Sequence, residues 1–240
     1  MSVTSTLQRI WTKNVSNSVA KRKLIRGLER IAKLPSEELR NVDSVVDIIR
    51  GIGLRHDTRG VYGSESAYMN RTNNGLWQIP QQLAKAMIAL SRQEIITFLE
   101  VGTHTGYTSS VLIAYLHRFN PKLKAMTIDP ENMFKHYSTI QSMIPLEYRS
   151  YTSDDLRGHS YDCVLIDGDH SYEAVRKDFE NVGSFARICM FHDINDDLVG
   201  FDNVPKFWKE LVASDSFSET HEFLDCAQDK HVMGIGIGIK

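Results

Sequence analysis

Acidic and histidine side chains follow two apolar runs in the second half of the chain. The first run ends in Asp167-Gly168-Asp169-His170, and the second ends in His192-Asp193. Open α/β sheets bind ligands beyond the carboxyl ends of their parallel strands, so we expect these side chains to share one mouth. A histidine there can accept a proton near neutral pH. Two carboxylates with an imidazole can also hold a divalent cation. The residues therefore predict acid–base chemistry, with or without a metal.

A glycine-punctuated loop precedes these motifs. An apolar run over residues 95–99 leads into Glu100, and Gly102 and Gly106 follow before a predicted helix. Such a loop lets a ligand approach backbone N–H groups at a helix N-terminus. Asp129 ends the next apolar run, where a carboxylate can accept hydrogen bonds from ribose hydroxyls. The loop alone can be purely structural, but together with Asp129 it predicts a nucleoside-containing cofactor. Its spacing is not the Gly-x-Gly-x-x-Gly of NAD sites.

Three residues at the predicted mouth also have plain structural interpretations. Asp169 is expected to be an N-cap or first-turn acid of the helix that starts near Ser171. His192 is either a ligand or a hydrogen-bond partner that orients Asp193. His104, inside the glycine loop, is expected to accommodate the backbone of the loop rather than to act as a catalyst.

The elements that must position these residues alternate between strand and helix. The predicted strands lie near 95–100, 123–128, 146–151, 161–166 and 187–192. The predicted helices lie near 106–118, 131–143, 171–183 and 204–213. Such alternation favours a parallel sheet covered on both faces. Two strand-like runs, 217–224 and 231–239, follow without a helix between them, and predict a hairpin with antiparallel pairing at one sheet edge.

The first third of the chain is predicted to be helical up to a long irregular segment. Apolar residues recur every three to four positions before residue 33 and again over 42–52, which indicates amphipathic helices. Pro80 is expected to open a further helix that runs through Leu90. The segment 54–75 is rich in Gly, Ser, Asn and Arg, and loops of this length are often lids or binding loops. We therefore divide the chain into a helical extension with a lid-like loop, 1–75, and a catalytic domain, 76–240.

Composition narrows the class of protein. Of 240 residues, 42% are hydrophobic and 24% charged, as in an ordinary globular protein, and the net charge of −2 gives no general reason to bind nucleic acid. The three cysteines are too widely spaced for a zinc cluster or a disulfide framework, which suggests a reducing compartment. No run approaches the roughly 18 apolar residues of a membrane span. We expect a cytoplasmic protein; the basic stretch before Arg26 leaves a transit peptide as the less favoured alternative.

Three motifs together resemble S-adenosylmethionine-dependent methyltransferases. Residues 100–109 resemble motif I of that superfamily, most closely the form found in catechol-type O-methyltransferases. Residues 166–172 and 191–193 look like the small-molecule O-methyltransferase group that includes macrolide-sugar enzymes. The resemblance covers about Gly75 to Lys240. It implies an α/β, Rossmann-like methyltransferase fold, with a seven-stranded, mostly parallel sheet, an antiparallel C-terminal strand and an N-terminal helical extension.

The resemblance also implies roles for individual residues. His170 falls where relatives carry a general base. Asp167, His192 and Asp193 fall at metal-ligand positions for Mg²⁺ or Mn²⁺, although relatives with an established metal usually show Asp-Asn or Glu-Asp where this chain has His192-Asp193. Gln78 is expected to close over the cofactor beside Trp77. The residues that would bind S-adenosylmethionine are Glu100, Gly102, Thr103, Gly106, Asp129, Ser153, Asp154, Asp167 and Trp77.

The reaction that fits these roles is O-methylation of a small hydroxylated acceptor, with a sugar hydroxyl as the favoured class. The alternatives are metal-independent N- or carboxyl-methylation, and a catalytically inactive cofactor-binding scaffold. Nucleic acid is not an expected partner. A homodimer that forms through the N-terminal helices is one assembly that we consider.

Overall fold

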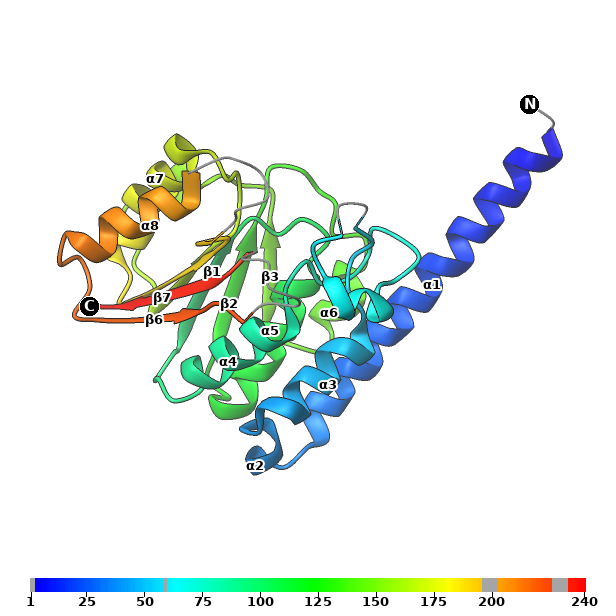
Figure 1. The fold of residues 1–240 in the computed structure, drawn as a ribbon, viewed down its shortest axis with the longest axis horizontal. Helices are drawn as coiled ribbons and strands as arrows, with labels where there is room; N and C mark the ends of the chain where they lie inside the picture. Colours follow the sequence, from blue (N-terminus) through cyan, green and yellow to red (C-terminus); the bar gives the residue numbers. More distant parts are fainter. Residues whose placement is uncertain (1–2, 58–59, 196–202, 226–232) are drawn as a thin grey trace.

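A sheet of seven strands runs through the centre of the fold (Figure 1). The structure, a computed structural model, describes residues 3–57, 60–195, 203–225 and 233–240, and only the backbone of residues 3–15. The strands are β1 (Thr97–Val101), β2 (Lys124–Ile128), β3 (Leu146–Arg149), β4 (Cys163–Ile166), β5 (Ile188–His192), β6 (Glu219–Phe223) and β7 (Ile235–Ile239).

The strand order is β3-β2-β1-β4-β5-β7-β6. The first five strands pair in parallel, and β7 pairs antiparallel with both β5 and β6. The predicted methyltransferase-type sheet with an antiparallel C-terminal strand is therefore confirmed. Residues 226–232, which include the beginning of the predicted run 231–239, lie outside the described residues.

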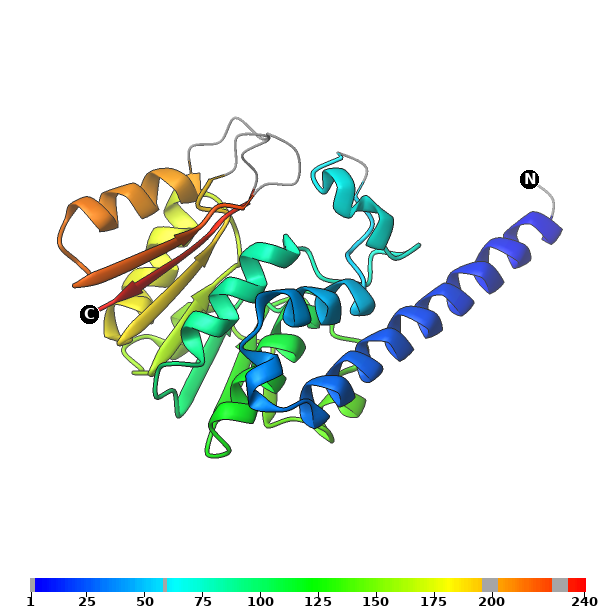
Figure 2. The same cartoon turned by 60° about the horizontal axis from the view of Figure 1, so that its bottom comes forward.

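Helices cover both faces of this sheet, as the strand–helix alternation predicted (Figure 2). The α-helices are α1 (Val3–Lys33), α2 (Ser36–Leu39), α3 (Val42–Ile52), α4 (Pro80–Leu90), α5 (Tyr107–Phe119), α6 (Tyr137–Gln141), α7 (Tyr172–Asn181) and α8 (Asn203–Ala213). The 3₁₀ helices are η1 (Gly63–Tyr68), η2 (Ser153–Leu156) and η3 (Gly183–Phe185). Apolar residues of α1, α3, α4 and α5 form one core cluster, and those of α7 and α8 form the other.

The central strands are apolar on both faces because each face meets a layer of helices. In β4, Cys163 and Leu165 join the cluster with α4 and α5, whereas Val164 and Ile166 join the cluster with α7 and α8. Successive side chains of a strand point to opposite faces, so a strand buried on both sides becomes a continuous apolar run. This is why the strands could be located from sequence.

Strand β7 differs from the others because glycine occupies one of its faces. Ile235 and Ile237 are buried in one core cluster. On the other face a Cβ at Gly236 would lie 2.8 Å from the Trp208 ring, and one at Gly238 would lie 2.5 Å from Cγ of Phe217. The two aromatic rings therefore rest on the backbone of β7 itself.

The N-terminal residues form one long helix rather than several short ones. Helix α1 is continuous from Val3 to Lys33, and its first half extends away from the rest of the fold in both views (Figures 1 and 2). Its second half buries Leu24, Leu28 and Ile31 in the same cluster as α3 and α5. The predicted homodimer through these helices and the division at residue 75 stay predictions. Among the described residues, the chain has no helix with the length and apolarity that crossing a bilayer requires.

The predicted helix 131–143 is wrong over its first half, because α6 begins only at Tyr137. The Asp129 Oδ1 atom accepts the backbone N–H of Glu131 at 2.8 Å, which fixes a local turn after β2. Asx turns of this kind compete with helix formation. Phe134 then turns inward and is buried against Gly106, which a helix starting at residue 131 would not provide for.

Candidate functional site

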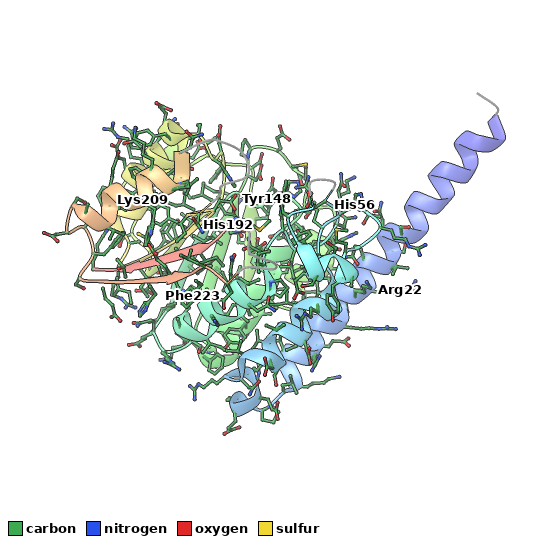
Figure 3. The ribbon with its side chains drawn as sticks, in the orientation of Figure 1. Arg22, His56, Tyr148, His192, Lys209 and Phe223 are labelled. Carbon is green, nitrogen blue, oxygen red and sulfur yellow. The ribbon has the colours of Figure 1, made fainter. Side chains whose placement is uncertain are left out.

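A cavity of about 570 Å³ opens at the carboxyl ends of β1, β4 and β5. Its lining includes residues 102–105 and 107–108 after β1, 167–171 after β4, and His192 and Asp193 at the end of β5. The first turn of α8, Met233 before β7 and four residues between positions 55 and 77, among them Arg55 and Trp77, complete its described wall. The parallel sheet thus brings the glycine loop and the acidic and histidine motifs to one place. Figure 3 labels His192 within the body of the fold.

The glycines of the loop after β1 are required by packing within the protein. Gly102 has φ +100°, and a Cβ there would overlap the Asp167 carbonyl group and lie 2.6 Å from Cα of Gly168. Gly106, with φ +76°, has the Phe134 ring where a Cβ would stand. From the sequence we interpreted these glycines as allowing a ligand to approach the backbone closely. Their contacts give a second reason for glycine at these positions, because the loops after β1 and β4 touch at Gly102.

Asp129 is hydrogen-bonded to the backbone of the glycine loop. Its Oδ2 atom accepts the backbone N–H of His104 at 2.7 Å. His104 itself has φ +47°, in the left-handed region, in line with its expected role in accommodating the loop backbone. Asp129 does not line the cavity, and its predicted contact with ribose hydroxyls stays a prediction. Each carboxylate oxygen keeps a further lone pair for such a contact.

Glu100 is buried beneath the loop rather than exposed to the cavity. Its Oε2 atom accepts hydrogen bonds from the hydroxyls of Ser109 and Thr127, and its Oε1 atom has no hydrogen-bond partner. Burial outweighs the opposing effect of these two hydroxyls and raises the pKa of Glu100 to about 8. The carboxyl group is therefore protonated at neutral pH in the folded protein.

The pKa of Glu100 predicts a fall in stability with rising pH. The unfolded chain loses this proton near pH 4.5, whereas the folded chain keeps it to about pH 8. Between these values the folded state binds more protons, so its free energy of unfolding decreases as pH rises. Glu100→Gln keeps the shape of the protonated group. We expect the variant to match the wild type near pH 4.5 and to exceed its free energy of unfolding by roughly 2–5 kcal/mol at pH 8.

Urea unfolding at both pH values measures this difference. The exposed residue Glu173, changed to glutamine, is the control for removal of a carboxylate, and it should not reproduce the large gain in stability at pH 8. An equal effect of Glu100→Gln at pH 4.5 and pH 8 would contradict the assignment of a neutral Glu100.

Two histidines and two aspartates form a linked cluster on the floor of the cavity. His170 Nδ1 lies 2.7 Å from Asp193 Oδ2, and His170 Nε2 lies 3.6 Å from Asp167 Oδ1. His192 Nδ1 lies 3.0 Å from Asp167 Oδ1, and Gln78 Nε2 donates to Asp167 Oδ2 at 3.2 Å. His192 is buried, whereas the side chain of His170 is 44% exposed and accessible from the cavity.

Burial and ion pairing act in opposite directions on this cluster. Burial by itself lowers the pKa of His170, but Asp167 and Asp193 outweigh it and raise that pKa to about 10. The pKa of His192 is raised in the same way, chiefly by Asp167 against the effect of burial. Burial opposes ionisation of Asp167, yet His192 and His170 hold its pKa below the usual range. The two imidazoles thus stabilise Asp167 as an anion.

The predicted metal ligands are mostly paired with one another. Within the described residues, no three His, Cys, Asp or Glu side chains converge in a way that could hold a divalent metal ion. Of the predicted ligands, Asp167 contacts His192 and Gln78, and Asp193 Oδ2 contacts His170. Asp193 Oδ1 and His192 Nε2 are buried and have no hydrogen-bond partner, and the predicted metal stays a prediction. His192 is thus hydrogen-bonded to Asp167. Its Nδ1 atom also lies 3.4 Å from Asp193 Oδ1, so the predicted contact with Asp193 is present as well.

Ser153 and Asp154 lie outside the cavity lining. The Ser153 hydroxyl donates to Asp178 at 2.6 Å, and Asp154 accepts from Asn181 and pairs with Lys177. These contacts attach η2 to α7, and the predicted contact of both residues with adenine stays a prediction.

Asp169 lines the cavity but does not cap the following helix. The N-cap residue of α7 is Ser171, and Asp169 Oδ1 accepts the backbone N–H of Ser171 at 2.8 Å. The expectation of an N-cap at Asp169 is wrong, because the chain makes an Asx turn first and the helix starts at Tyr172.

Two cavity residues were given no role from the sequence. Tyr107 is buried with a hydroxyl that has no hydrogen-bond partner, and burial raises the pKa of its phenol above the usual range. Arg55 places its guanidinium 3.9 Å from the centroid of the Trp77 ring. The aromatic residue after Gly106 was a usable signal for Tyr107. Nothing in the sequence distinguishes Arg55 from the other arginines of its segment, Arg59 and Arg71.

A family model described as "Methyltransferase domain" matches residues 99–194, which span β1 to the end of β5 and contain the glycine loop and the histidine–aspartate cluster. Among curated proteins, no sequence matches the chain significantly.

Solved methyltransferase structures share the fold. An O-methyltransferase from Bacillus cereus, in complex with SAH, is 15% identical, with a TM-score of 0.52 over 68% of this chain and 82% of its own. TomG from Streptomyces achromogenes, an O-methyltransferase of tomaymycin synthesis in complex with SAM, is 14% identical, with a TM-score of 0.51 over 78% and 92%. The CurJ carbon methyltransferase is 11% identical, with a TM-score of 0.51 over 98% and 69%.

Proposed function

We propose that the chain is an S-adenosylmethionine-dependent methyltransferase that methylates a hydroxyl oxygen of a small molecule, with a sugar hydroxyl as the favoured acceptor. The methyltransferase-domain model over residues 99–194 and the shared fold support this proposal. Two of the similar structures are named O-methyltransferases, and a third is named a carbon methyltransferase. One fold hosts different chemistries, so the acceptor atom has to be argued from the site.

The observation that carries this proposal is the pairing of His170 with Asp193 at the cavity. Asp193 Oδ2 lies 2.7 Å from His170 Nδ1 and can keep the proton on that nitrogen. Against the effect of burial, Asp167 and Asp193 raise the pKa of His170 to about 10, so the neutral imidazole is the minor form at pH 7. In that form the Nε2 atom is the proton acceptor. A hydroxyl group is a poor nucleophile while protonated, and a base within hydrogen-bond reach removes that obstacle. This requirement favours an oxygen acceptor.

The reaction is a single displacement. S-adenosylmethionine supplies an electrophilic methyl group on a sulfonium. Bound S-adenosylmethionine would give up its methyl group to the acceptor oxygen and keep the carbon–sulfur electron pair as a neutral thioether, and His170 Nε2 would take the hydroxyl proton. Asp193 stabilises the resulting imidazolium. Positioning of the two reactants contributes much of the rate, and the cavity walls would supply it.

The cofactor would lie against the glycine loop. Gly102 and Thr103 line the cavity there, and Trp77 lines the facing wall, which supports their predicted roles. Tyr107, at the start of α5, also lines the cavity, and its buried hydroxyl has no hydrogen-bond partner, which supports a polar ligand here. Gly106 and Glu100 would act indirectly, by shaping the loop and by supporting it from beneath.

The pairing of the two aspartates with imidazoles favours a reaction that needs no metal. His192 contacts Asp167 and His170 contacts Asp193 Oδ2, so these carboxylates would serve to orient His192 and His170. An inactive scaffold is the less favoured alternative, because it has no need of several polar side chains converging on one cavity.

A methyltransferase assay across a panel of acceptors, read by release of S-adenosylhomocysteine, tests the proposal. We expect turnover with hydroxylated acceptors and an unchanged rate after treatment with EDTA. Amine and carboxylate acceptors in the panel are the comparison. Loss of activity in EDTA that Mg²⁺ or Mn²⁺ restores would contradict the metal-free reaction, and preference for an amine or a carboxylate would contradict O-methylation.

A further inference from the structure

The segment 54–75 turns back on its own beginning at one wall of the cavity. The N–H of Asn70 donates to the carbonyl of Leu54 at 2.7 Å, and the N–H of Arg55 donates to the carbonyl of Leu76 at 2.7 Å. Leu54 and Leu76 also form a β-bridge. Arg55 lines the cavity, so this backbone closure determines where the wall of the cavity stands.

The side chain of Asn70 lies at the centre of this closure. It is buried, with 5% of the residue exposed. Its Nδ2 atom donates to the carbonyl of Ile52 at 3.3 Å and to the carbonyl of Asn74 at 3.0 Å. A Cβ at Gly53 would lie 2.5 Å from Asn70 Oδ1, so the carboxamide rests directly on the backbone that follows α3. Asn70 therefore connects the end of α3 with the returning end of the segment.

Helix α1 contacts the closure through two side chains. The Lys23 Nζ atom donates to Asn70 Oδ1 at 2.9 Å, and Asn74 Nδ2 donates to Asn17 Oδ1 at 2.8 Å. In Figure 1 the segment, drawn in cyan, lies beside the middle of α1, and Figure 3 labels Arg22, the residue before Lys23. A charged donor on α1 thus satisfies a buried amide oxygen behind the cavity wall.

Helix α1 has other contacts that attach it to the fold. The apolar residues of its second half, Leu24 among them, are buried in the same core cluster as those of α3 and α5. Lys21, two residues before Lys23, donates to Thr139 Oγ1 in α6 at 3.0 Å. Attachment of the helix is thus provided elsewhere, and the hydrogen bond of Lys23 acts on the segment 54–75.

We infer that Lys23 is a positioning residue of the cavity: through Asn70, it determines where the wall that carries Arg55 and Trp77 lies. Without the ammonium group, Asn70 Oδ1 loses this donor, and an unsatisfied buried oxygen is costly. The carboxamide then has to reorient, which weakens its two hydrogen bonds to backbone carbonyls. The inference rests on the proposed function, because the ligands of this cavity are those of the proposed reaction.

Hydrogen–deuterium exchange of the ligand-free protein tests the first step, which does not depend on the proposed function. We expect Lys23→Met to speed exchange of the backbone amides of Arg55 and Asn70 about 10- to 100-fold, as for loss of a hydrogen bond to a charged group. The amides of β1 should exchange as in the wild type. Lys23→Arg keeps a charged donor and should recover most of the protection.

Lys21→Met is the matched control. It removes the same charge from the same helix together with a hydrogen bond of similar length, but that bond is made to α6. Its amides in the segment 54–75 should exchange as in the wild type. Equal exchange of this segment in Lys23→Met and Lys21→Met would overturn the inference.

Ligand binding and kinetics test the second step. In calorimetry, we expect Lys23→Met to bind S-adenosylhomocysteine about 3- to 10-fold more weakly, because a displaced wall makes fewer contacts with the ligand. The KM for S-adenosylmethionine should rise by a similar factor and kcat should stay within about 2-fold, since His170 and Asp193 lie on other loops. Lys21→Met should match the wild type in both measurements.

A merely structural Lys23 would give a different result. Lys23→Met would then lower the thermal unfolding temperature and leave the affinity and the KM unchanged, and this outcome would overturn the inference. Failure of the wild type to bind S-adenosylhomocysteine would instead overturn the proposed function, while the exchange experiment would still report on the contact between Lys23 and Asn70.

Discussion

Replacement of Gly102 by alanine is expected to lower the free energy of unfolding by about 3–5 kcal/mol. The added methyl group would overlap the Asp167 carbonyl and lie 2.6 Å from Cα of Gly168, and both neighbours are backbone. No change of rotamer relieves such a contact, so the loops after β1 and β4 have to separate. The left-handed φ of +100° adds its own cost for any residue with a side chain.

Gly158→Ala isolates the conformational part of this cost. Gly158 also has a left-handed φ, +78°, but nothing lies within 4 Å of an added Cβ. Its replacement should cost about 1–2 kcal/mol. Urea unfolding of the two variants measures the difference. If the two losses were equal, the close contact between the two loops would have no energetic weight.

Replacement of His170 by alanine is expected to lower kcat about 10²- to 10⁴-fold while S-adenosylhomocysteine binds as in the wild type. The variant loses the base but keeps the glycine loop, Trp77 and Arg55. Steady-state kinetics and calorimetry give the two measurements. His159→Ala is the control, because His159 is exposed and lies outside the cavity lining. Full activity of His170→Ala would remove His170 from the mechanism.

The pH dependence of the wild type provides a second readout for His170. Asp167 and Asp193, working against burial, raise the pKa of His170 to about 10. Only the neutral imidazole can accept a proton, so kcat should increase as the pH rises above neutrality. The residual rate of His170→Ala should lack this increase. A wild-type rate that is flat between pH 7 and pH 9 would contradict the role of a paired histidine.

Much of the fold follows from local pattern. Strands β4 and β5 are continuous apolar runs because both their faces are buried, and their predicted positions were right to within two residues. Helix α4 starts at Pro80 and ends at Leu90 as predicted, since proline suits the first turn of a helix. The start of α6 was predicted too early because of side-chain contacts of Asp129 and Phe134. Such contacts cannot be recognised from the spacing of apolar residues.

The candidate site divides in the same way. Asp167, His170, His192 and Asp193 could be grouped from sequence because parallel strands deliver their carboxyl ends to one edge. How they pair could not, because the 2.7 Å contact of His170 with Asp193 depends on the left-handed backbone at Asp193 and on side-chain rotamers. Arg55 reaches the cavity through the pairing of Leu54 with Leu76, a contact between residues far apart in the chain.

The glycines of β7 affect the shape of the cavity, although β7 itself does not line it, because α8 packs on them. Trp208 of α8 lies directly on the backbone at Gly236, and the first turn of α8 carries Val204 and Pro205 at the cavity. A larger residue at position 236 would push α8 outward and widen the cavity at that turn. The width of the cavity at this turn can therefore change through the edge hairpin, with the contact between His170 and Asp193 unchanged.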